Sequence, residues 1–156
     1  MKFAGKKIFI GGIQGSGKTV AARHLSKQFR SIISVRLTPD FDDLGNITLV
    51  KPELGREKET LEELAKMLVE WGKQYEAGTL KEMPFDCLLI DEGDKFFQNN
   101  FEIGPYMNDL VLLHRHYGLA IVIITRRPQD IPARIVESCH HLFFFKIEGH
   151  NVKTKL

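Results

Sequence analysis

The sequence has few of the features that mark secreted, metal-binding or membrane proteins. Its two cysteines, Cys87 and Cys139, lack the spacing of metal ligands, and we interpret both as reduced thiols, which suit a reducing compartment. No apolar run approaches the roughly 20 residues that span a bilayer. The N-terminus leads directly into a predicted strand instead of a signal peptide. We therefore expect a soluble protein of the cytoplasm, or of a host's cytoplasm if the source is viral.

Strong charge and repetition are also missing. The formal net charge is +2, which does not by itself indicate a nucleic acid or membrane partner. The chain contains no internal repeat, low-complexity tract or linker. Its 156 residues suffice for one domain with a sizeable core. We expect residues 1–156 to form that single domain.

What the sequence does contain is an alternation of strand and helix patterns. Expected strands cover residues 7–11, 32–37, 47–50, 87–90, 119–124 and 142–147. Expected helices cover residues 18–29, 57–76, 106–117 and 131–138. Residues three and four apart predict the buried sides of two helices: Val20, Ala21, Leu25 and Phe29, then Leu61, Leu64, Ala65, Leu68, Trp71 and Tyr75. Because strands such as CLLI are apolar throughout, we predict an α/β fold, a parallel sheet with helices on both faces.

A phosphate-binding pattern follows the first expected strand. Residues 12–19, GIQGSGKT, match G-x-x-x-x-G-K-[ST] at every fixed position. The glycines let backbone N–H groups point at phosphates, and the following helix adds positive potential. Lys18 is expected to bridge the β- and γ-phosphates of ATP, and Thr19 to give Mg²⁺ a hydroxyl. The candidate nucleotide-binding residues are Gly12, Gln14, Gly15, Ser16, Gly17, Lys18, Thr19 and Val20. The plainer alternative is a glycine-rich turn without a ligand.

Two acids end the strand in CLLIDE. At the carboxyl edge of a parallel sheet, Asp91 and Glu92 would face the same crevice as the phosphate loop. Asp91 is expected to hold Mg²⁺ through water, and Glu92 to polarise an attacking water as a general base. A kinase has no use for a base aimed at water, so this pair favours hydrolysis over phosphate transfer. Alternatively, the two acids only begin a solvated loop.

These motifs together resemble the HerA–FtsK branch of P-loop motor ATPases. The resemblance combines the phosphate loop, LLIDE and residues 110–145. Residues 114–125, HRHYGLAIVIIT, are also similar to the zonula occludens toxin-like ATPases of filamentous phages and to packaging ATPases of viruses with internal membranes. The resemblance covers nearly the whole chain. It implies a P-loop NTPase fold with a RecA-like ASCE core.

The resemblance also implies catalytic roles for two arginines beside Lys18 and Glu92. Arg115 lies on the helix before GLAIVII, where such ATPases present an arginine to the neighbouring subunit's nucleotide. The family usually has Gln after the threonine that ends the next strand, but this chain has Arg126 and then Arg127. Arg126 is expected to contact the γ-phosphate from within the subunit, or else to face a neighbour.

Other residues have plainer interpretations. We expect packing or helix-end roles for His114 and His116. Cys139 with His140 and His141 is poor metal-ligand geometry. Core packing is expected for Phe96, Phe97 and Phe101, with a subunit contact or a substrate loop in a ring's pore as alternatives. The lysines near the two ends are expected to be solvated: Lys2, Lys6, Lys7, Lys153 and Lys155.

Three functions remain open at this point. The resemblance implies a Mg²⁺-dependent ATPase, a motor subunit in a homo-oligomeric ring such as a hexamer, acting on DNA without sequence preference in translocation or packaging. The opening GIQGSGKTVAARHLSKQF also resembles nucleoside monophosphate kinases, but those need an arginine-rich lid, and residues 93–110 contain Lys95 and no arginine. A nucleotide-dependent assembly or switch protein is the third possibility.

Overall fold

The structure is a computed structural model that describes residues 2–37, 41, 43–97 and 103–146. Its strands are β1 (Lys7–Gly11), β2 (Ile32–Val35), β3 (Ile47–Val50), β4 (Cys87–Ile90), β5 (Ala120–Thr125) and β6 (His141–Phe144). Its helices are α1 (Lys18–Ser26), α2 (Glu57–Glu76), α3 (Gly93–Phe96), α4 (Pro105–Leu113) and α5 (Ala133–Glu137), with a 3₁₀ turn, η1, at Pro128–Asp130.

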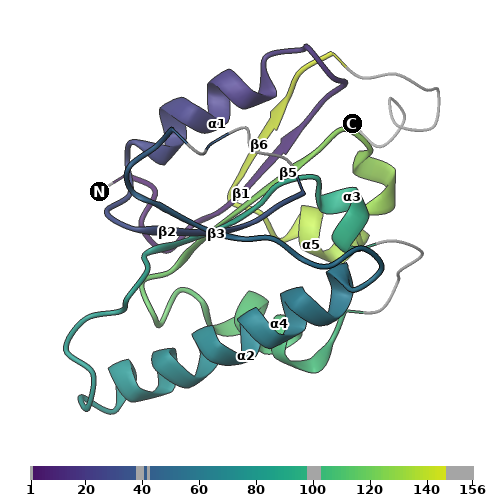
Figure 1. Ribbon diagram of the computed structural model, residues 1–156. Coiled ribbons are helices and arrows are strands. Elements are labelled where there is room, and N and C mark those ends of the chain that lie inside the picture. The colour runs from purple at the N-terminus through teal and green to yellow at the C-terminus, as the bar shows by residue number, and fades with distance from the viewer. Residues whose placement is uncertain (1, 38–40, 42, 98–102, 147–156) are drawn as a thin grey trace.

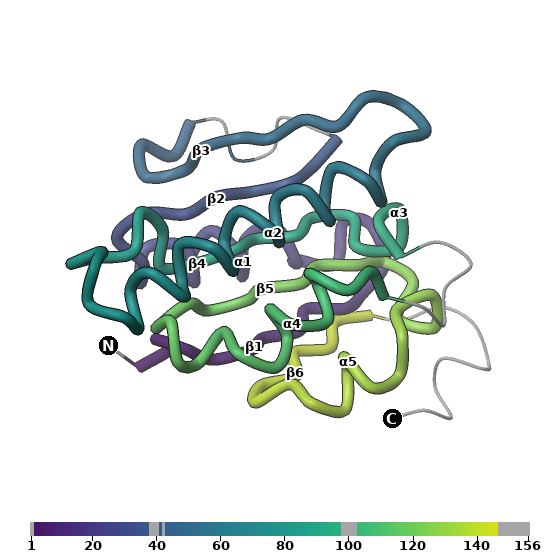
Figure 2. The backbone as a smooth tube through the Cα atoms, turned by 90° about the horizontal axis from the view of Figure 1, so that it is seen from below, coloured from purple at the N-terminus to yellow at the C-terminus, as the bar shows by residue number. Residues whose placement is uncertain are grey.

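The six strands form one parallel sheet in the order β3-β2-β4-β5-β1-β6 (Figure 2). β1 lies between β5 and β6, so the phosphate loop leaves the sheet beside the end of β5. Gly11 pairs with Thr125, and Ile90 pairs with Ile123. The register thus brings the carboxyl ends of β1, β4 and β5 to one edge, and the predicted parallel α/β fold is confirmed.

Helices cover both faces of the sheet, but unequally (Figure 1). One core cluster joins α1 to the sheet through Ala22, Leu25 and Phe29. The other cluster joins the opposite face to α2, α3, α4 and α5. Strand residues alternate between the two clusters, as period-two geometry requires: Leu88 faces α2 and Leu89 faces α1. Among the described residues, the α1 face therefore has one covering helix, whereas the α2 face has several.

Some element ends differ from those expected. α1 ends at Ser26 instead of residue 29, although Phe29 is still buried. α4 ends at Leu113 instead of residue 117, because the chain tightens into turns there. The amides of Tyr117 and Gly118 donate to carbonyls three residues earlier, and Gly118 adopts a φ of 63°, which favours glycine. Three strands also differ from their expected ranges. The strand expected at 32–37 ends at Val35, and the strand expected at 119–124 runs from Ala120 to Thr125. The strand expected at 142–147 is β6, which covers His141–Phe144.

Three side chains contradict their expected environments. Lys7 is 6% exposed instead of solvated, because its ammonium donates to Ser138 Oγ at 2.7 Å between β1 and the chain after α5. Tyr75 is 39% exposed instead of in the core, since it lies in the last turn of α2, whereas Trp71 packs against the core. Val20 is 59% exposed, because the first turn of α1 borders a cavity instead of the sheet.

α2 is an amphipathic helix of 20 residues whose outer side carries glutamates and lysines. Neither it nor any other helix in the described ranges combines the length and the apolar character that crossing a bilayer requires.

Candidate nucleotide site

A cavity of about 430 Å³ opens at the carboxyl edge of the sheet. Most of the residues expected to bind or react with nucleotide border it. Its lining consists of Gln14, Gly15, Gly17, Lys18, Thr19, Val20, Asp91, Glu92, Asp94, Ile124, Thr125 and Arg126. The phosphate loop and the acidic motif, about 70 residues apart in sequence, thus meet in one site.

Close packing and an unusual backbone conformation favour glycine at two positions of the phosphate loop, Gly12 and Gly17. A Cβ on Gly12 would lie 2.8 Å from Ser16 Oγ and 2.9 Å from Cβ of Phe145. Gly17 caps α1 with a φ of 102°, a conformation that side chains rarely adopt. Ser16 Oγ is buried and, within the described ranges, has no hydrogen-bond partner. An unsatisfied hydroxyl inside a glycine cradle at a helix N-terminus fits a phosphate ligand.

Lys18 extends into this cradle from the first position of α1. Its ammonium donates a hydrogen bond to the carbonyl of Ile13 at 2.7 Å, so the loop itself holds the side chain. Partial burial lowers the pKa of Lys18; Asp91 and Asp94 oppose that shift, and Arg126 adds to it. Two carboxylates and a guanidinium therefore act electrostatically on this ammonium in the same cavity.

Asp91 and Glu92 stand where β4 ends. Asp91 is 8% exposed, and its Oδ1 accepts the backbone N–H of Glu92 at 2.8 Å. Among the described residues other than glycine, only Glu92 has a positive φ, 53°. A left-handed backbone conformation raises the free energy of a residue that has a Cβ by on the order of 1 kcal/mol. Such strain is typical of functional sites, and here it belongs to the residue expected to act as the general base.

A third acid, Asp94, was not predicted from the sequence. It is 3% exposed, lines the cavity, and accepts a hydrogen bond from Thr125 Oγ1 at 3.2 Å. The motif DEGD contained a signal, because the one-turn helix α3 returns the residue three positions after Asp91 to the same site. That helix was not expected, since four residues are too few to show a periodic pattern.

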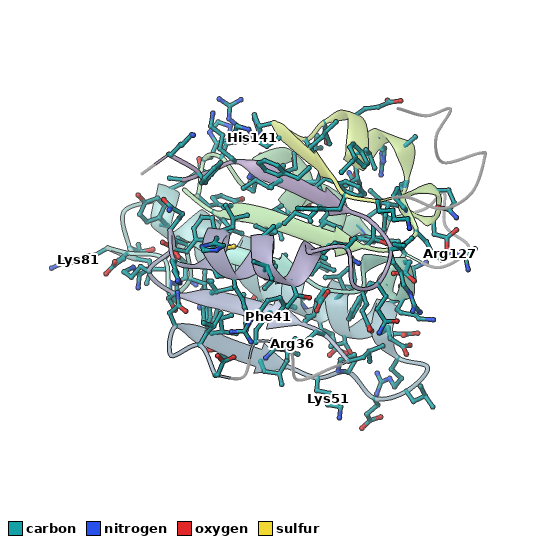
Figure 3. All side chains as sticks on the ribbon, turned by 90° about the horizontal axis from the view of Figure 1, so that it is seen from above. Arg36, Phe41, Lys51, Lys81, Arg127 and His141 are labelled. Atoms are coloured by element: carbon teal, nitrogen blue, oxygen red, sulfur yellow. The ribbon has the colours of Figure 1, made fainter. Side chains whose placement is uncertain are left out.

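The three arginines of interest lie in different places. Arg126 borders the cavity. Arg127, the next residue, forms an exposed ion pair with Asp130 at 2.9 Å and lies at the outer edge of the molecule (Figure 3). Arg115 precedes β5, and its backbone lies 3.8 Å from a Cβ built on Gly5, ahead of β1. It is therefore at the amino edge of the sheet, and the five residues of β1 alone separate it from its own phosphate loop by about 16 Å.

The remaining predicted residues take structural positions. His114 is 1% exposed, and its Nδ1 donates to the carbonyl of Leu119 at 2.8 Å, which confirms a packing role. His116 is exposed. Phe96 and Phe97 are buried in the core, as expected, and Phe101 lies outside the described residues. Within the described ranges, no three His, Cys, Asp or Glu side chains converge in a way that could hold a metal ion.

The donor set nevertheless fits a Mg²⁺ ion that is held mainly by nucleotide. Thr19 and Asp91 border the same cavity. Mg²⁺ prefers one or two protein oxygens together with water and phosphate oxygens. A hydroxyl and a carboxylate beside a phosphate cradle therefore match its needs.

Comparisons with known proteins agree with this geometry. The AAA domain family matches residues 3–129. The protein "Uncharacterized protein 075L" of Invertebrate iridescent virus 6 is 28% identical over 152 residues, 94% of this chain. The chain spans 57% of that relative's length.

Two solved structures extend the comparison. The genome packaging NTPase B204 of Sulfolobus turreted icosahedral virus 2, in complex with ATP-gammaS, has a TM-score of 0.70 and 18% identity, over 94% of this chain and 78% of B204. EssC (ATPases 2 and 3) from Geobacillus thermodenitrificans has a TM-score of 0.70 and 14% identity, over 97% of this chain and 34% of EssC. The predicted P-loop NTPase fold, and the likeness to a viral packaging NTPase, are confirmed.

Proposed function

Because the chain belongs to the AAA domain family, we propose that it is an ATP-hydrolysing motor subunit that assembles into a ring and acts on DNA, in translocation or packaging. One observation carries the hydrolytic part of this proposal. The phosphate loop with Lys18 and Thr19, and the acids Asp91 and Glu92, border one cavity at the sheet's carboxyl edge. We take residues 1–156 as one ATPase domain, and motor or packaging activity is part of the proposal for this chain.

Each side chain has a distinct task in this proposal. Lys18 places positive charge at the β- and γ-phosphates. Thr19 and Asp91 would hold Mg²⁺, which neutralises charge on the phosphate oxygens. Glu92 would accept the proton of an attacking water. Arg126 would contact the γ-phosphate from within the subunit, since it borders the same cavity.

The DNA and ring parts rest on similarity. A viral protein and a viral genome-packaging NTPase are among the similar proteins, and a ring would sum weak, sequence-independent contacts to the DNA backbone over its subunits. Arg115 is exposed at the edge opposite its own cavity. A catalytic role for it therefore requires a neighbouring subunit.

The kinase alternative has less support. A kinase needs cationic side chains over its acceptor, yet the described parts of residues 93–113 form α3 and α4, which pack against α2. They contain no arginine. A switch protein with incidental hydrolysis would share the same cavity and is separated by the experiment below.

The test measures phosphate release from ATP and Mg²⁺ with and without DNA, and phosphate transfer to nucleoside monophosphates. We expect hydrolysis that DNA stimulates, and none in Lys18→Ala, which loses the charge at the phosphates. Transfer to an acceptor would favour the kinase, and slow hydrolysis indifferent to DNA would favour the switch. Normal turnover in Lys18→Ala would refute the site itself.

A further inference from the structure

The net charge is close to zero, but basic and acidic residues are unevenly distributed along the chain. Residues 1–39 contain eight basic residues and no Asp or Glu. The basic residues are Lys2, Lys6, Lys7, Lys18, Arg23, Lys27, Arg30 and Arg36. The whole chain has 22 Lys and Arg and 20 Asp and Glu, so residues 40–156 carry 14 and 20. The N-terminal quarter is therefore strongly basic and the remainder acidic.

The fold converts this segregation into two faces of opposite sign. The basic segment supplies β1, β2 and α1, which is the helix over one face of the sheet (Figure 1). α1 has no acidic residue, whereas α2, on the other face, has six glutamates and three lysines. A polyanion would therefore be attracted to the α1 face and repelled from the α2 face.

Three cations of this segment remain available on its surface. Lys7 and Arg36 are buried, Lys18 faces the nucleotide cavity, and Arg23 and Arg30 pair with Asp43 and Glu82. In contrast, Lys2 and Lys27 are exposed and Lys6 is partly exposed. Within the described ranges no carboxylate pairs with any of these three.

More positive charge gathers at the amino end of β6. Burial lowers the pKa of His140, and the nearby basic groups Lys6, Arg115, Lys7 and His141 lower it further. The backbone of Arg115 lies 3.8 Å from the Cβ position of Gly5, the residue before Lys6, so Lys6 and Arg115 come from separate elements to one corner.

An apolar groove of about 310 Å³ lies beside this charge, between α1 and the edge strand β6. Its lining includes Phe3, Ile10, Ala21, Leu25, Gln28 and Phe143. Phe143 is 41% exposed and stacks on His141 at 6.3 Å, and His141 meets the ring of Phe3 at 5.3 Å. The Lys2 ammonium lies 5.5 Å from the Phe3 ring. A row of aromatic rings thus ends in a cation.

We propose that this face binds single-stranded DNA, with phosphates on Lys2, Lys6 and Lys27 and an unstacked base in the groove against Phe143. Cations that follow a backbone, next to aromatic rings that stack bases, are the chemistry of sequence-independent single-strand recognition. Duplex DNA offers the same phosphates but no free base face for the groove. The inference rests on the proposed function, whose DNA form it specifies.

The same basic face of a second subunit is not expected to bind here, because two basic faces repel each other. The acidic α2 face of a neighbouring subunit is the remaining rival. Such a head-to-tail contact would change the mass of the assembly when the lysines are reversed.

The experiment compares two charge-matched triple variants. Lys2→Glu, Lys6→Glu and Lys27→Glu reverse the basic face, and Lys58→Glu, Lys73→Glu and Lys81→Glu make the same change at exposed lysines elsewhere. Fluorescence anisotropy measures binding of a labelled oligothymidine of about 20 nucleotides, longer than the roughly 4–16 that such a site covers, and of a duplex of the same length. Light scattering gives the assembly mass, and basal ATPase activity controls for folding.

We expect the basic-face variant to bind the single strand at least ~10-fold more weakly, and its slope of log K against log salt to fall by about 2. The control variant should stay near wild type. Phe143→Ala should weaken single-strand binding roughly 10-fold and duplex binding little, whereas Leu142→Ala, on the other side of β6, should change neither.

Each other outcome overturns the proposal in an identifiable way. DNA binding that both triple variants retain, or lose equally, refutes this face and leaves the proposed motor intact. Altered mass with unaltered DNA affinity identifies the face as a subunit contact. If the protein prefers the duplex, and Phe143→Ala does not change DNA affinity, then the groove does not bind a base. If the wild-type protein hydrolyses ATP but binds neither the single strand nor the duplex, DNA is not its partner. The DNA part of the proposed function and this inference are then both wrong.

Discussion

Thr125 and Asp94 are joined by a buried hydrogen bond at the edge of the nucleotide cavity, 3.2 Å from hydroxyl to carboxylate. The same Thr125 hydroxyl accepts the backbone N–H of Arg127 at 3.0 Å, and the Thr125 carbonyl accepts the N–H of Gly12 at 3.1 Å. One threonine therefore links the acidic motif, the phosphate loop and the start of the arginine pair. We infer that it positions Arg126, its neighbour in sequence, relative to Glu92.

Thr125→Val tests this link with little change of shape. The valine lacks the hydroxyl, so Asp94 and the Arg127 amide each lose a partner in a buried site. We expect kcat to fall roughly 10-fold while KM for ATP changes less than about 3-fold, because the link orients catalytic groups and does not itself bind phosphate. Thr125→Ser keeps a hydroxyl and should recover most of the rate. Unchanged kcat in the valine variant would show that the bond has only a structural role.

Glu92→Gln separates binding from hydrolysis. Glutamine keeps the size and the left-handed backbone position but cannot take a proton from water. ATP binding, measured by calorimetry, should stay near wild type while turnover falls by roughly 10²-fold or more. Glu92→Asp serves as the control for carboxylate position. If Glu92→Gln hydrolyses ATP at the normal rate, another group activates the water and the kinase alternative gains support.

Much of this site was predictable because local patterns specify it. The phosphate loop and CLLIDE place Lys18 and Asp91 at strand ends, and parallel strands carry those ends to one edge. Asp94 was not predictable in the same way, since its role depends on a one-turn helix and on Thr125, 31 residues further along. Lys7 was misjudged for a related reason. Its position near the N-terminus suggests solvent, but the fold brings the Val111 carbonyl of α4 and the Ser138 hydroxyl after α5 to its buried ammonium.

Acid should destabilise the protein partly through His114. Burial is the main cause that lowers its pKa from 6.5 to about 4; the hydrogen bond with the Leu119 carbonyl opposes the shift, and the nearby basic groups Lys7, His140 and Arg115 add to it. Between those pH values His114 binds a proton in the unfolded chain but stays neutral in the folded chain. Stability that is complete above pH 6.5 should therefore fall as pH drops to 4, by up to roughly 3 kcal/mol from this residue.

The measurement for His114 is urea unfolding at a series of pH values. His114→Gln keeps a side-chain donor for the Leu119 carbonyl but does not titrate, so its free energy of unfolding should depend less on pH between 6.5 and 4. His116→Gln is the matched control, because His116 lies two residues later and is exposed. Equal pH dependence in wild type and His114→Gln would contradict the prediction.

Arg115 provides the test of the ring. Its position at the amino edge keeps it out of its own cavity, so any catalytic effect must reach a neighbour's nucleotide. Arg115→Ala should then bind ATP nearly as well as wild type but hydrolyse it poorly. Mixing Arg115→Ala with Glu92→Gln subunits should restore part of the activity, because some interfaces pair an intact Glu92 with an intact Arg115.

The control for that mixture uses the arginine inside the cavity. Arg126 and Glu92 border the same cavity of one subunit, so a mixture of Arg126→Ala and Glu92→Gln leaves every site defective and should show no rescue. Rescue in the first mixture alone would therefore identify Arg115 as the residue that acts between subunits. Specific activity measured over a range of protein concentrations is the sharper test, because a ring must dissociate on dilution. Specific activity that stays constant on dilution, in protein that light scattering shows to be monomeric throughout, would contradict both the arginine in trans and the ring motor.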